Sequence, residues 1–136
     1  MDDLLKSSRI AVSGMKAQSE RLRVISENMA NVDSLAQSPD GTPYRRKVVT
    51  FKSELNKVDN YNQVKVSKVG NDKSDFQRRY DPTHPAADKD GYVLTPNVNP
   101  LIEMMDMREA ERSYEANLSV ITSSRQMLNK TIELLR

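Results

Sequence analysis

Hydrophobic residues recur with a helical period at both ends of the chain and lose that period in the middle. Over the first part of the chain the spacing alternates between four and three residues, which is the heptad pattern of a helix that packs along another helix. Asp2 and Asp3 stand at the start, where the helix dipole favours negative charge. The pattern predicts a helix over about residues 2–33, with a packing seam formed by Leu4, Ser8, Ala11, Met15, Gln18, Leu22, Ile25, Met29 and Val32.

The last part of the chain repeats this pattern. Asn99 is a suitable N-cap, and Pro100 suits a first helical turn because its missing N–H would have no partner there. The pattern predicts a second helix over about residues 100–135, with a seam formed by Met104, Met107, Glu111, Tyr114, Leu118, Ile121, Arg125, Leu128, Ile132 and Leu135.

The two seams have similar lengths, so the helices are expected to pack side by side as an antiparallel coiled-coil pair. Polar residues interrupt both seams, and a two-helix hairpin of this kind is only marginally stable alone. We therefore expect the helices to order fully within an assembly. The predicted register places Leu4 near Leu135, Ala11 near Leu128, Gln18 near Ile121 and Val32 near Met107.

Other apolar residues lie off both seams. In a helix pair each helix covers only one stripe of its partner, so these residues need another neighbour. We expect them to meet other subunits: Leu5, Val12 and Val24 in the first helix, and Met105, Val120, Met127 and Leu134 in the second.

Residues 34–99 have a different character. They contain five of the six prolines, three of the four glycines and both phenylalanines. Short alternating runs replace the heptads, which predicts a β-rich or loop-rich insert with strands near 48–51, 64–69, 76–80 and 92–94. The expected fold is mainly α with a small β-rich insert, organised as an N-terminal helix (1–33), the insert (34–99) and a C-terminal helix (100–136).

Composition narrows the possible chemistry. The chain has no cysteine and a single histidine, which excludes disulfides, thiol nucleophiles and thiolate zinc sites. The net charge of +2 comes from many charges of both signs, which predicts a mixed surface. We expect no catalytic site, metal or cofactor. No apolar run is long enough for a membrane span, and the first residues lack the pattern of a cleaved signal peptide.

Two loop segments carry residues that chemistry could use. His84 lies between two prolines, where a turn histidine is usually exposed, so a Ser–His–Asp site is not expected. Asp88 and Asp90 could take the third and fifth positions of a calcium loop. Ala86 would then stand first and Asn97 last, so two essential ligands would be missing. We expect the two aspartates to solvate a turn.

The densest basic clusters contain Arg45, Arg46, Arg78 and Arg79, with tyrosines beside them. Such clusters can contact phosphates or stack on bases, so a basic helical adaptor that binds nucleic acid is the alternative function from another class. Nearby acidic residues weaken that interpretation. A solvated strand face is the simpler expectation, and contact with an acidic neighbouring subunit is the second.

Two segments carry specific sequence motifs in addition to the hydrophobic period. Residues 13–34, SGMKAQSERLRVISENMANVDS, resemble the N-terminal signature of bacterial flagellar rod and hook proteins. Its landmark is the Asn28-Met-Ala-Asn31 stretch followed by Ser34, where the family commonly has threonine. Residues 91–135, together with PYRRKVVTF (43–51) and YDPTHPAADKDGYV (80–93), resemble the short proximal-rod members of that family.

This resemblance implies a structural role. Such subunits are exported unfolded through the flagellar type III channel without cleavage and stack helically into the periplasmic rod of the basal body. The implied partners are copies of the same chain, other rod proteins, the export apparatus and ring components, with no nucleic acid. The paired helices would line the inner tube, and the insert would form an outer layer. A longer distal-rod or hook protein is the nearer alternative.

The expected assembly surface combines the seams with residues that match the family. Asn28, Asn31, Tyr114, Glu115 and Asn117 serve either contacts between subunits or capping and turn hydrogen bonds within one subunit, and the sequence leaves both open. The full set comprises Leu4, Ala11, Met15, Leu22, Ile25, Asn28, Met29, Asn31, Val32, Met104, Met107, Tyr114, Glu115, Asn117, Leu118, Ile121, Leu128, Ile132 and Leu135, with possible basic contacts from Arg45, Arg46, Arg78 and Arg79.

Overall fold

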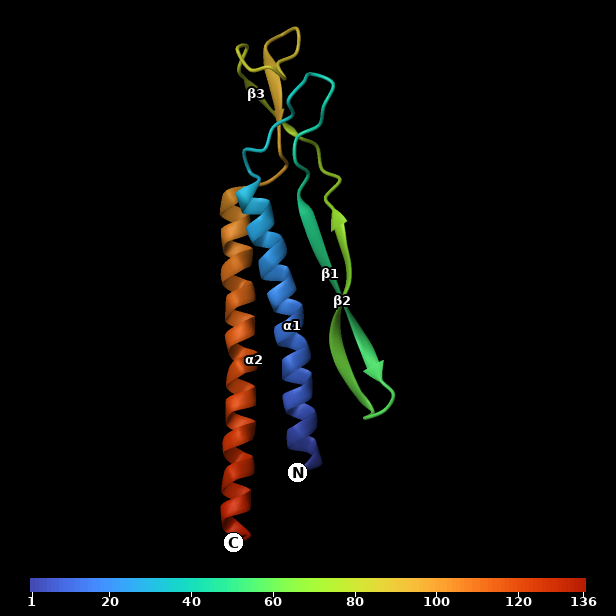
Figure 1. Ribbon diagram of the computed structural model, residues 1–136, viewed down its shortest axis with the longest axis vertical. Helices are drawn as coiled ribbons and strands as arrows, with labels where there is room; N and C mark the ends of the chain where they lie inside the picture. Colours follow the sequence, from blue (N-terminus) through green and yellow to red (C-terminus); the bar gives the residue numbers. More distant parts are fainter. The chain divides into compact units, whose positions relative to one another are not determined.

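The computed structural model describes all 136 residues and contains two long helices with four strands between them (Figure 1). This arrangement confirms the predicted fold class. No helix is long and apolar enough to cross a membrane. The elements in chain order are α1 (Asp2–Ala30), β1 (Lys47–Asn56), β2 (Tyr61–Asn71), β3 (Gln77–Tyr80), β4 (Tyr92–Thr95) and α2 (Pro100–Leu134).

The chain forms two compact units, each assembled from separated segments. Unit 1 comprises Met1–Leu22, Val49–Lys68 and Arg108–Arg136. Unit 2 comprises Arg23–Val48 and Val69–Met107.

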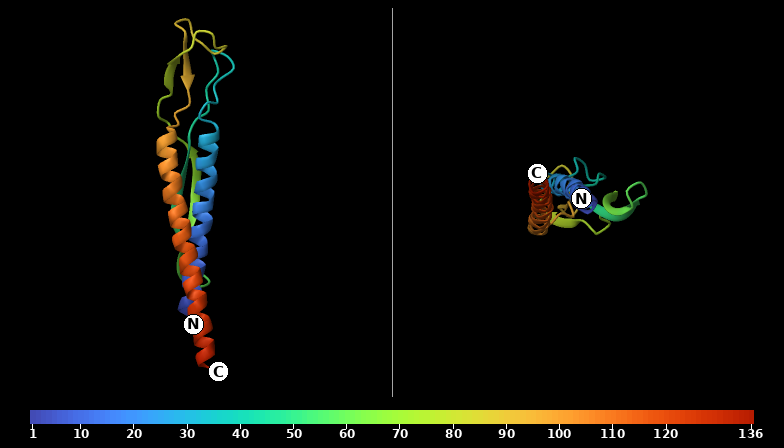
Figure 2. Two further views of the ribbon diagram at one scale, coloured as in Figure 1. Left: turned by 90° about the vertical axis from the view of Figure 1, so that its left-hand side faces the viewer. Right: turned by 90° about the horizontal axis from the view of Figure 1, so that it is seen from below.

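In unit 1, α1 lies between α2 and the hairpin formed by β1 and β2 (Figures 1 and 2). On the hairpin side, the Ser13 hydroxyl accepts a hydrogen bond of 3.1 Å from the Val64 N–H. On the other side, a Cβ built on Gly14 would lie only 2.7 Å from Nδ2 of Asn117. Glycine at position 14 therefore leaves room for the Asn117 side chain of α2.

In unit 2, the short strands β3 and β4 pair antiparallel, with Gln77 opposite Thr95 and Tyr80 opposite Tyr92. The connection between them closes at Gly91, whose φ of 84° favours glycine. A Cβ there would also lie 3.0 Å from the Tyr80 ring. The apolar core of this unit is small and consists of Val24, Ile25, Ala86, Val93 and Val98.

The helix ends follow local chemistry. Asn99 caps α2, because its Oδ1 accepts a hydrogen bond of 3.0 Å from the Leu101 N–H. Helix α1 ends at Ala30, slightly earlier than predicted. Asn31 there donates from Nδ2 to the Glu27 carbonyl at 2.8 Å and accepts from the Ser34 hydroxyl at 2.9 Å. These side-chain bonds replace the next helical turn and end the helix.

The predicted seam of α1 is confirmed as a covered face, because none of its nine residues is exposed. Four of the ten predicted seam residues of α2 are covered: Met107, Tyr114, Ile121 and Leu128. At four other positions the prediction is one residue late: Met104, Glu111, Leu118 and Arg125 are exposed, while Glu103, Ala110, Asn117 and Ser124 are covered. Ile132 and Leu135 are wrong as well, because every residue from 129 to 136 is exposed.

One contact in unit 1 shows the shift directly. Hydrophobicity selects Leu118, but the space over Gly14 is filled by the side chain of Asn117, one position earlier. Val24, predicted to meet other subunits, is likewise not on an outer face. It is 2% exposed and belongs to the core of unit 2.

The predicted register is also wrong. It would place Arg125 opposite Gly14, whereas the residue found there is Asn117, eight positions earlier in α2. A heptad pattern repeats every seven residues, so it defines which face of a helix packs but not where along its axis the partner lies. In the observed register, the last turns of α2 extend past the start of α1 (Figure 1).

Candidate functional site

Helix α2 exposes most of its large apolar side chains. Leu134 is 87% exposed, Leu135 77% and Leu101 67%. The covered positions hold four large side chains, Met107, Tyr114, Ile121 and Leu128, together with small or polar residues such as Ala110 and Ser124. This distribution departs from the usual amphipathic helix, which buries most of its large apolar residues. The exposed set comprises Leu101, Ile102, Met104, Met105, Leu118, Val120, Met127, Ile132 and Leu134, with Leu135 directly after the helix.

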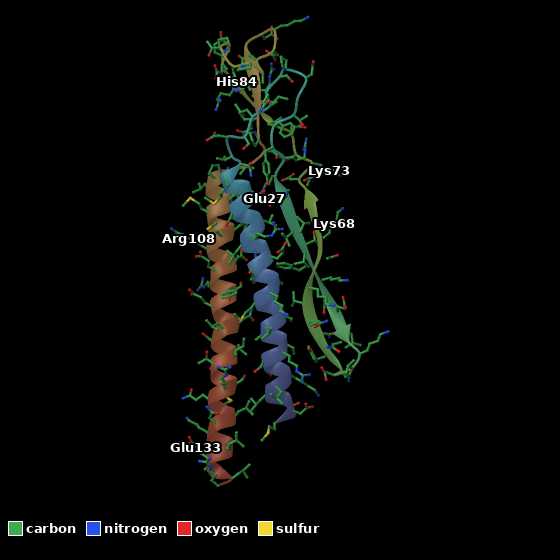
Figure 3. All side chains as sticks on the ribbon, viewed as in Figure 1. Glu27, Lys68, Lys73, His84, Arg108 and Glu133 are labelled. Atoms are coloured by element: carbon green, nitrogen blue, oxygen red, sulfur yellow. The ribbon has the colours of Figure 1, made fainter.

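The last turn of α2 shows this exposure clearly. Figure 3 labels Glu133 in this turn, near the end of the chain. Every residue from 129 to 136 is exposed. Apolar residues gathered on an uncovered helix are the usual sign of a protein–protein contact surface.

A buried polar cluster in unit 2 joins the end of α1 to the segment before β1. Asn28 is 1% exposed and uses all of its hydrogen-bonding capacity. Its Nδ2 donates to the Lys47 carbonyl at 2.9 Å and to Oε2 of Glu103 at 3.2 Å. Its Oδ1 accepts from the Lys47 N–H at 2.9 Å and from the Tyr44 hydroxyl at 2.8 Å. The amide thus pairs with the backbone of Lys47 as a neighbouring strand would.

Glu103 is fully buried at the start of α2, and Arg46 supplies the matching charge. Nε of Arg46 donates to Oε1 of Glu103, and its terminal nitrogens lie 3.4 Å from carboxylate oxygens of Asp72 and Asp106. Burial disfavours the charge of Arg46, but the hydrogen bond to Glu103 and the nearby carboxylates outweigh it and raise the pKa of the guanidinium. The buried carboxylate is therefore compensated.

Two further side chains complete this cluster, Asn97 and Arg45. Asn97 accepts a hydrogen bond of 2.7 Å from the Arg46 N–H and donates to the Asp72 and Ser74 carbonyls at 3.1 and 3.2 Å. Arg45 donates to the same carbonyls at 2.8 and 3.0 Å, and its guanidinium lies 4.2 Å from the Phe76 ring centroid. The segment before β1 and the segment after β2 are thereby held together.

Asp72 and Glu27 form the charged margin of the cluster. The Ser74 N–H donates to the Asp72 carboxylate at 2.9 Å and, together with nearby Arg46, holds the pKa of Asp72 below its usual value. The Lys47 ammonium donates to Glu27, and this bond lowers the pKa of Glu27. Figure 3 labels Glu27 near the end of α1.

The loop residues with candidate chemistry serve the loop itself. Nδ1 of His84 accepts a hydrogen bond of 3.0 Å from the Ala86 N–H. Oδ1 of Asp88 accepts from the N–H groups of Asp90 and Tyr92, both at 2.9 Å, and the bond from Tyr92 is the main cause of a lowered pKa at Asp88. No three His, Asp or Glu side chains are arranged to hold a metal ion.

The predicted site residues fall into three groups. Asn28, Asn31, Arg45 and Arg46 make hydrogen bonds within the subunit. Arg78 donates to Asp88 at 3.2 Å and lies over the Tyr92 ring, while Arg79 is exposed on β3. The remaining residues lie along the helices. Leu4, Ala11, Met15, Leu22, Ile25, Met29, Val32, Met107, Tyr114, Asn117, Ile121 and Leu128 are covered, whereas Met104, Glu115, Leu118, Ile132 and Leu135 are exposed.

Sequence reasoning missed Glu103, Tyr44, Asp72 and Asn97. The one available signal was the basic triplet at residues 45–47, because so dense a cluster needs carboxylates nearby. Nothing in the linear pattern indicated that Glu103, placed between two apolar residues, would be the partner.

Comparisons with known proteins agree on one family. Residues 9–34 match the family described as "Flagella basal body rod protein", and residues 89–134 match "Flagellar basal body rod FlgEFG protein C-terminal". The chain is 55% identical to the flagellar basal-body rod protein FlgC of Agrobacterium fabrum, covering 100% of this chain and 98% of the relative. It is 41% identical to FlgC of Borreliella burgdorferi (98% of both chains) and 40% identical to FlgC of Bacillus subtilis (94% and 95%).

Proposed function

Because this chain belongs to the flagellar basal-body rod proteins named FlgC, we propose that it is a structural subunit of the proximal rod and polymerises helically through its terminal helices. The observation that carries this proposal is the exposed apolar surface of α2. Nine exposed large apolar side chains on one helix, with a tenth directly after it, favour association with other molecules.

The helices and the polar cluster have different roles in this proposal. The helices supply the contacts with neighbouring subunits, and the polar cluster keeps the insert folded in unit 2. In the rod, copies of this chain and other rod proteins would cover the apolar residues of α2. The insert would face outward, toward other rod subunits or ring components. The role is structural, and no reaction is assigned to any residue.

The route to the rod is part of the proposal. Subunits would pass unfolded through the flagellar export channel and reach a periplasmic rod. The small core of unit 2 and the exposed helix surfaces support this route, because a chain with little buried apolar area unfolds at low cost and regains stability on assembly.

Polar substitution of the exposed apolar residues tests the proposal. A triple variant, Val120→Asn, Met127→Asn and Leu134→Asn, is expected to fold as a monomer but to be lost from purified basal bodies and to abolish swimming. The matched control, Ser123→Asn with Gln126→Asn, changes exposed polar residues of the same helix and should incorporate normally.

Removal of residues 1–12 gives an independent test, because it deletes the first turns of α1. Rod incorporation should cease while the protein is still expressed. Normal motility in either the deletion or the triple variant would refute assembly through the helices.

A further inference from the structure

A groove in unit 1 runs between α1 and β2 and combines apolar with basic residues. No carboxylate lines it. Val12 is 41% exposed and Val64 36% exposed, so apolar surface is accessible along the groove. Its main lining residues are Arg9, Val12, Lys16, Val64, Lys65 and Val66.

The three cations of this groove are not equally neutralised. Arg9 lies 2.5 Å from a carboxylate oxygen of Asp59, and Lys65 lies 2.8 Å from one of Glu54. Lys16 makes no ion pair within the subunit. The groove therefore offers apolar contact together with one uncompensated positive charge.

A stripe on α2 of the same unit has the complementary character. Glu111, Glu115 and Leu118 are spaced by four and three residues, so they share one helix face. All three are exposed, and Leu118 is 47% exposed. The two carboxylates make no ion pair within the subunit, and like charges one turn apart repel each other. We call these three residues the acidic stripe.

We propose that the acidic stripe of one copy docks into the α1–β2 groove of a second copy. Leu118 would cover Val12 and Val64, and the two carboxylates would neutralise Lys16. This inference rests on the proposed function and names the partner that covers part of the α2 surface. Stripe and groove are different surfaces of the same unit, so each copy can donate its stripe to one neighbour and accept that of another.

Such a contact has a consequence for symmetry. A contact between two identical patches closes into a dimer, whereas a contact between two different patches continues from copy to copy. If the rotation between copies does not close a ring, the product is an open helix. The docking therefore supplies the repeating lateral contact that a helical rod requires.

Disulfide crosslinking tests whether the acidic stripe of one copy meets the groove of another. The chain has no native cysteine, so a disulfide between two copies can form only at the introduced positions. Two differently tagged copies are expressed together, one with Val64→Cys and the other with Leu118→Cys, and basal bodies are isolated and oxidised. We expect a crosslinked dimer that contains both tags. A chain carrying both cysteines should give a ladder of longer products. The control pairs Val64→Cys with Met127→Cys, an exposed residue of the same helix, and should crosslink weakly.

Charge exchange provides a second readout. Lys16→Glu and Glu115→Lys should each lower the crosslinked fraction about fivefold, which corresponds to a coupling of about 1 kcal/mol. The two changes combined should restore it, because the opposite charges are then only exchanged. A defect in folding would not be repaired in this way.

Three results would overturn the docking: equal or stronger crosslinking through Met127→Cys, no dimer containing both tags although both variants are present in basal bodies, or no rescue by the charge exchange. In these cases the chain would still be present in basal bodies, and its role as a rod subunit would stand. If Val64→Cys itself blocks incorporation, Val66→Cys replaces it. Absence of the unmodified chain from basal bodies would instead refute the proposed function.

Discussion

In unit 2 the segments meet through a buried and fully paired polar cluster, whereas in unit 1 the two helices cover only part of their apolar side chains. Asn28 and Glu103 are almost completely covered and satisfied by partners within the unit. In unit 1, Tyr114 and Leu128 are covered, but large apolar residues such as Leu118 stay exposed. The structure of unit 2 is thus determined by contacts within the unit, while unit 1 retains exposed apolar surface that other molecules can cover.

The difference between the two units has a physical basis. A polar cluster stabilises a fold only when every member is paired, and removal of one member leaves the others buried without partners. An apolar surface is less demanding, because any neighbour of suitable shape can cover it. The first arrangement favours a unique structure, and the second favours association.

The largest expected effect comes from Glu103→Ala in unit 2. The change leaves Arg46 and the Asn28 amide without their buried acceptor and should lower the free energy of unfolding by about 3 kcal/mol. Chemical denaturation measures the loss, and hydrogen exchange should show it in residues 23–48 and 69–107. Glu115→Ala, an exposed control, should have little effect. Equal losses in both variants would mean that the cluster does not stabilise unit 2.

A smaller effect is expected from Gly14→Leu in unit 1. The new side chain would displace the Asn117 side chain and disturb the packing between the helices, at a cost of about 2 kcal/mol. Faster hydrogen exchange in residues 1–22 and 108–136 would report it. Ser19→Leu, on an exposed position of α1, is the matched control. Unchanged exchange in Gly14→Leu would show that the space over Gly14 is not needed for this packing.

Gln18→Met should stabilise unit 1 by about 1 kcal/mol. Oε1 of Gln18 is buried without a hydrogen-bond partner, so replacing the amide with an apolar side chain of similar length removes the cost of dehydrating it. Thermal unfolding compares this variant with Gln126→Met, which changes an exposed glutamine of α2. A loss of stability in Gln18→Met would indicate that the amide is needed where it lies.

The smallest expected effect is a loss of stability at acidic pH. The pKa of Asp72 is lowered in the folded protein, so its contribution is present above the pKa of the unfolded chain and is lost as the pH falls through the folded value. The loss begins below about pH 3.9 and amounts to less than about 1 kcal/mol. Urea titrations at pH 5 and pH 3 should show a smaller difference in Asp72→Asn than in the unmodified protein. An identical pH dependence would exclude Asp72 as a source.

Much of the fold was predictable because it depends on local pattern. The Asn99 cap, the glycine turn at Gly91 and the alternating strand residues act over a few positions. The axial register and the covered face of α2 were not predictable, because a heptad repeat looks the same after a shift and a small residue such as Ala110 carries no hydrophobic signal.

Part of the candidate site was likewise predictable from the sequence, and part was not. The apolar residues Met127 and Leu134 were placed correctly off the seam, since helical periodicity alone puts them on an outer face. The partners of Asn28 and Arg46 were not found from sequence, because they come from segments far apart in the chain. Glu103, for example, lies 75 positions from Asn28. Only the folded structure shows which carboxylate pairs with which basic side chain.

The two-stranded hairpin has a consequence for how copies are kept apart before they are built into a larger structure. Strands β1 and β2 pair only with each other, so each retains an edge at which a further strand from another molecule could add. Charged side chains lie along both strands: Lys52 and Lys65 pair with Glu54 at 3.1 and 2.8 Å, and Lys68 is exposed. Addition of another strand would strip water from these charged groups, which discourages the edge-to-edge pairing from which amyloid grows and so protects a crowded pool of identical chains.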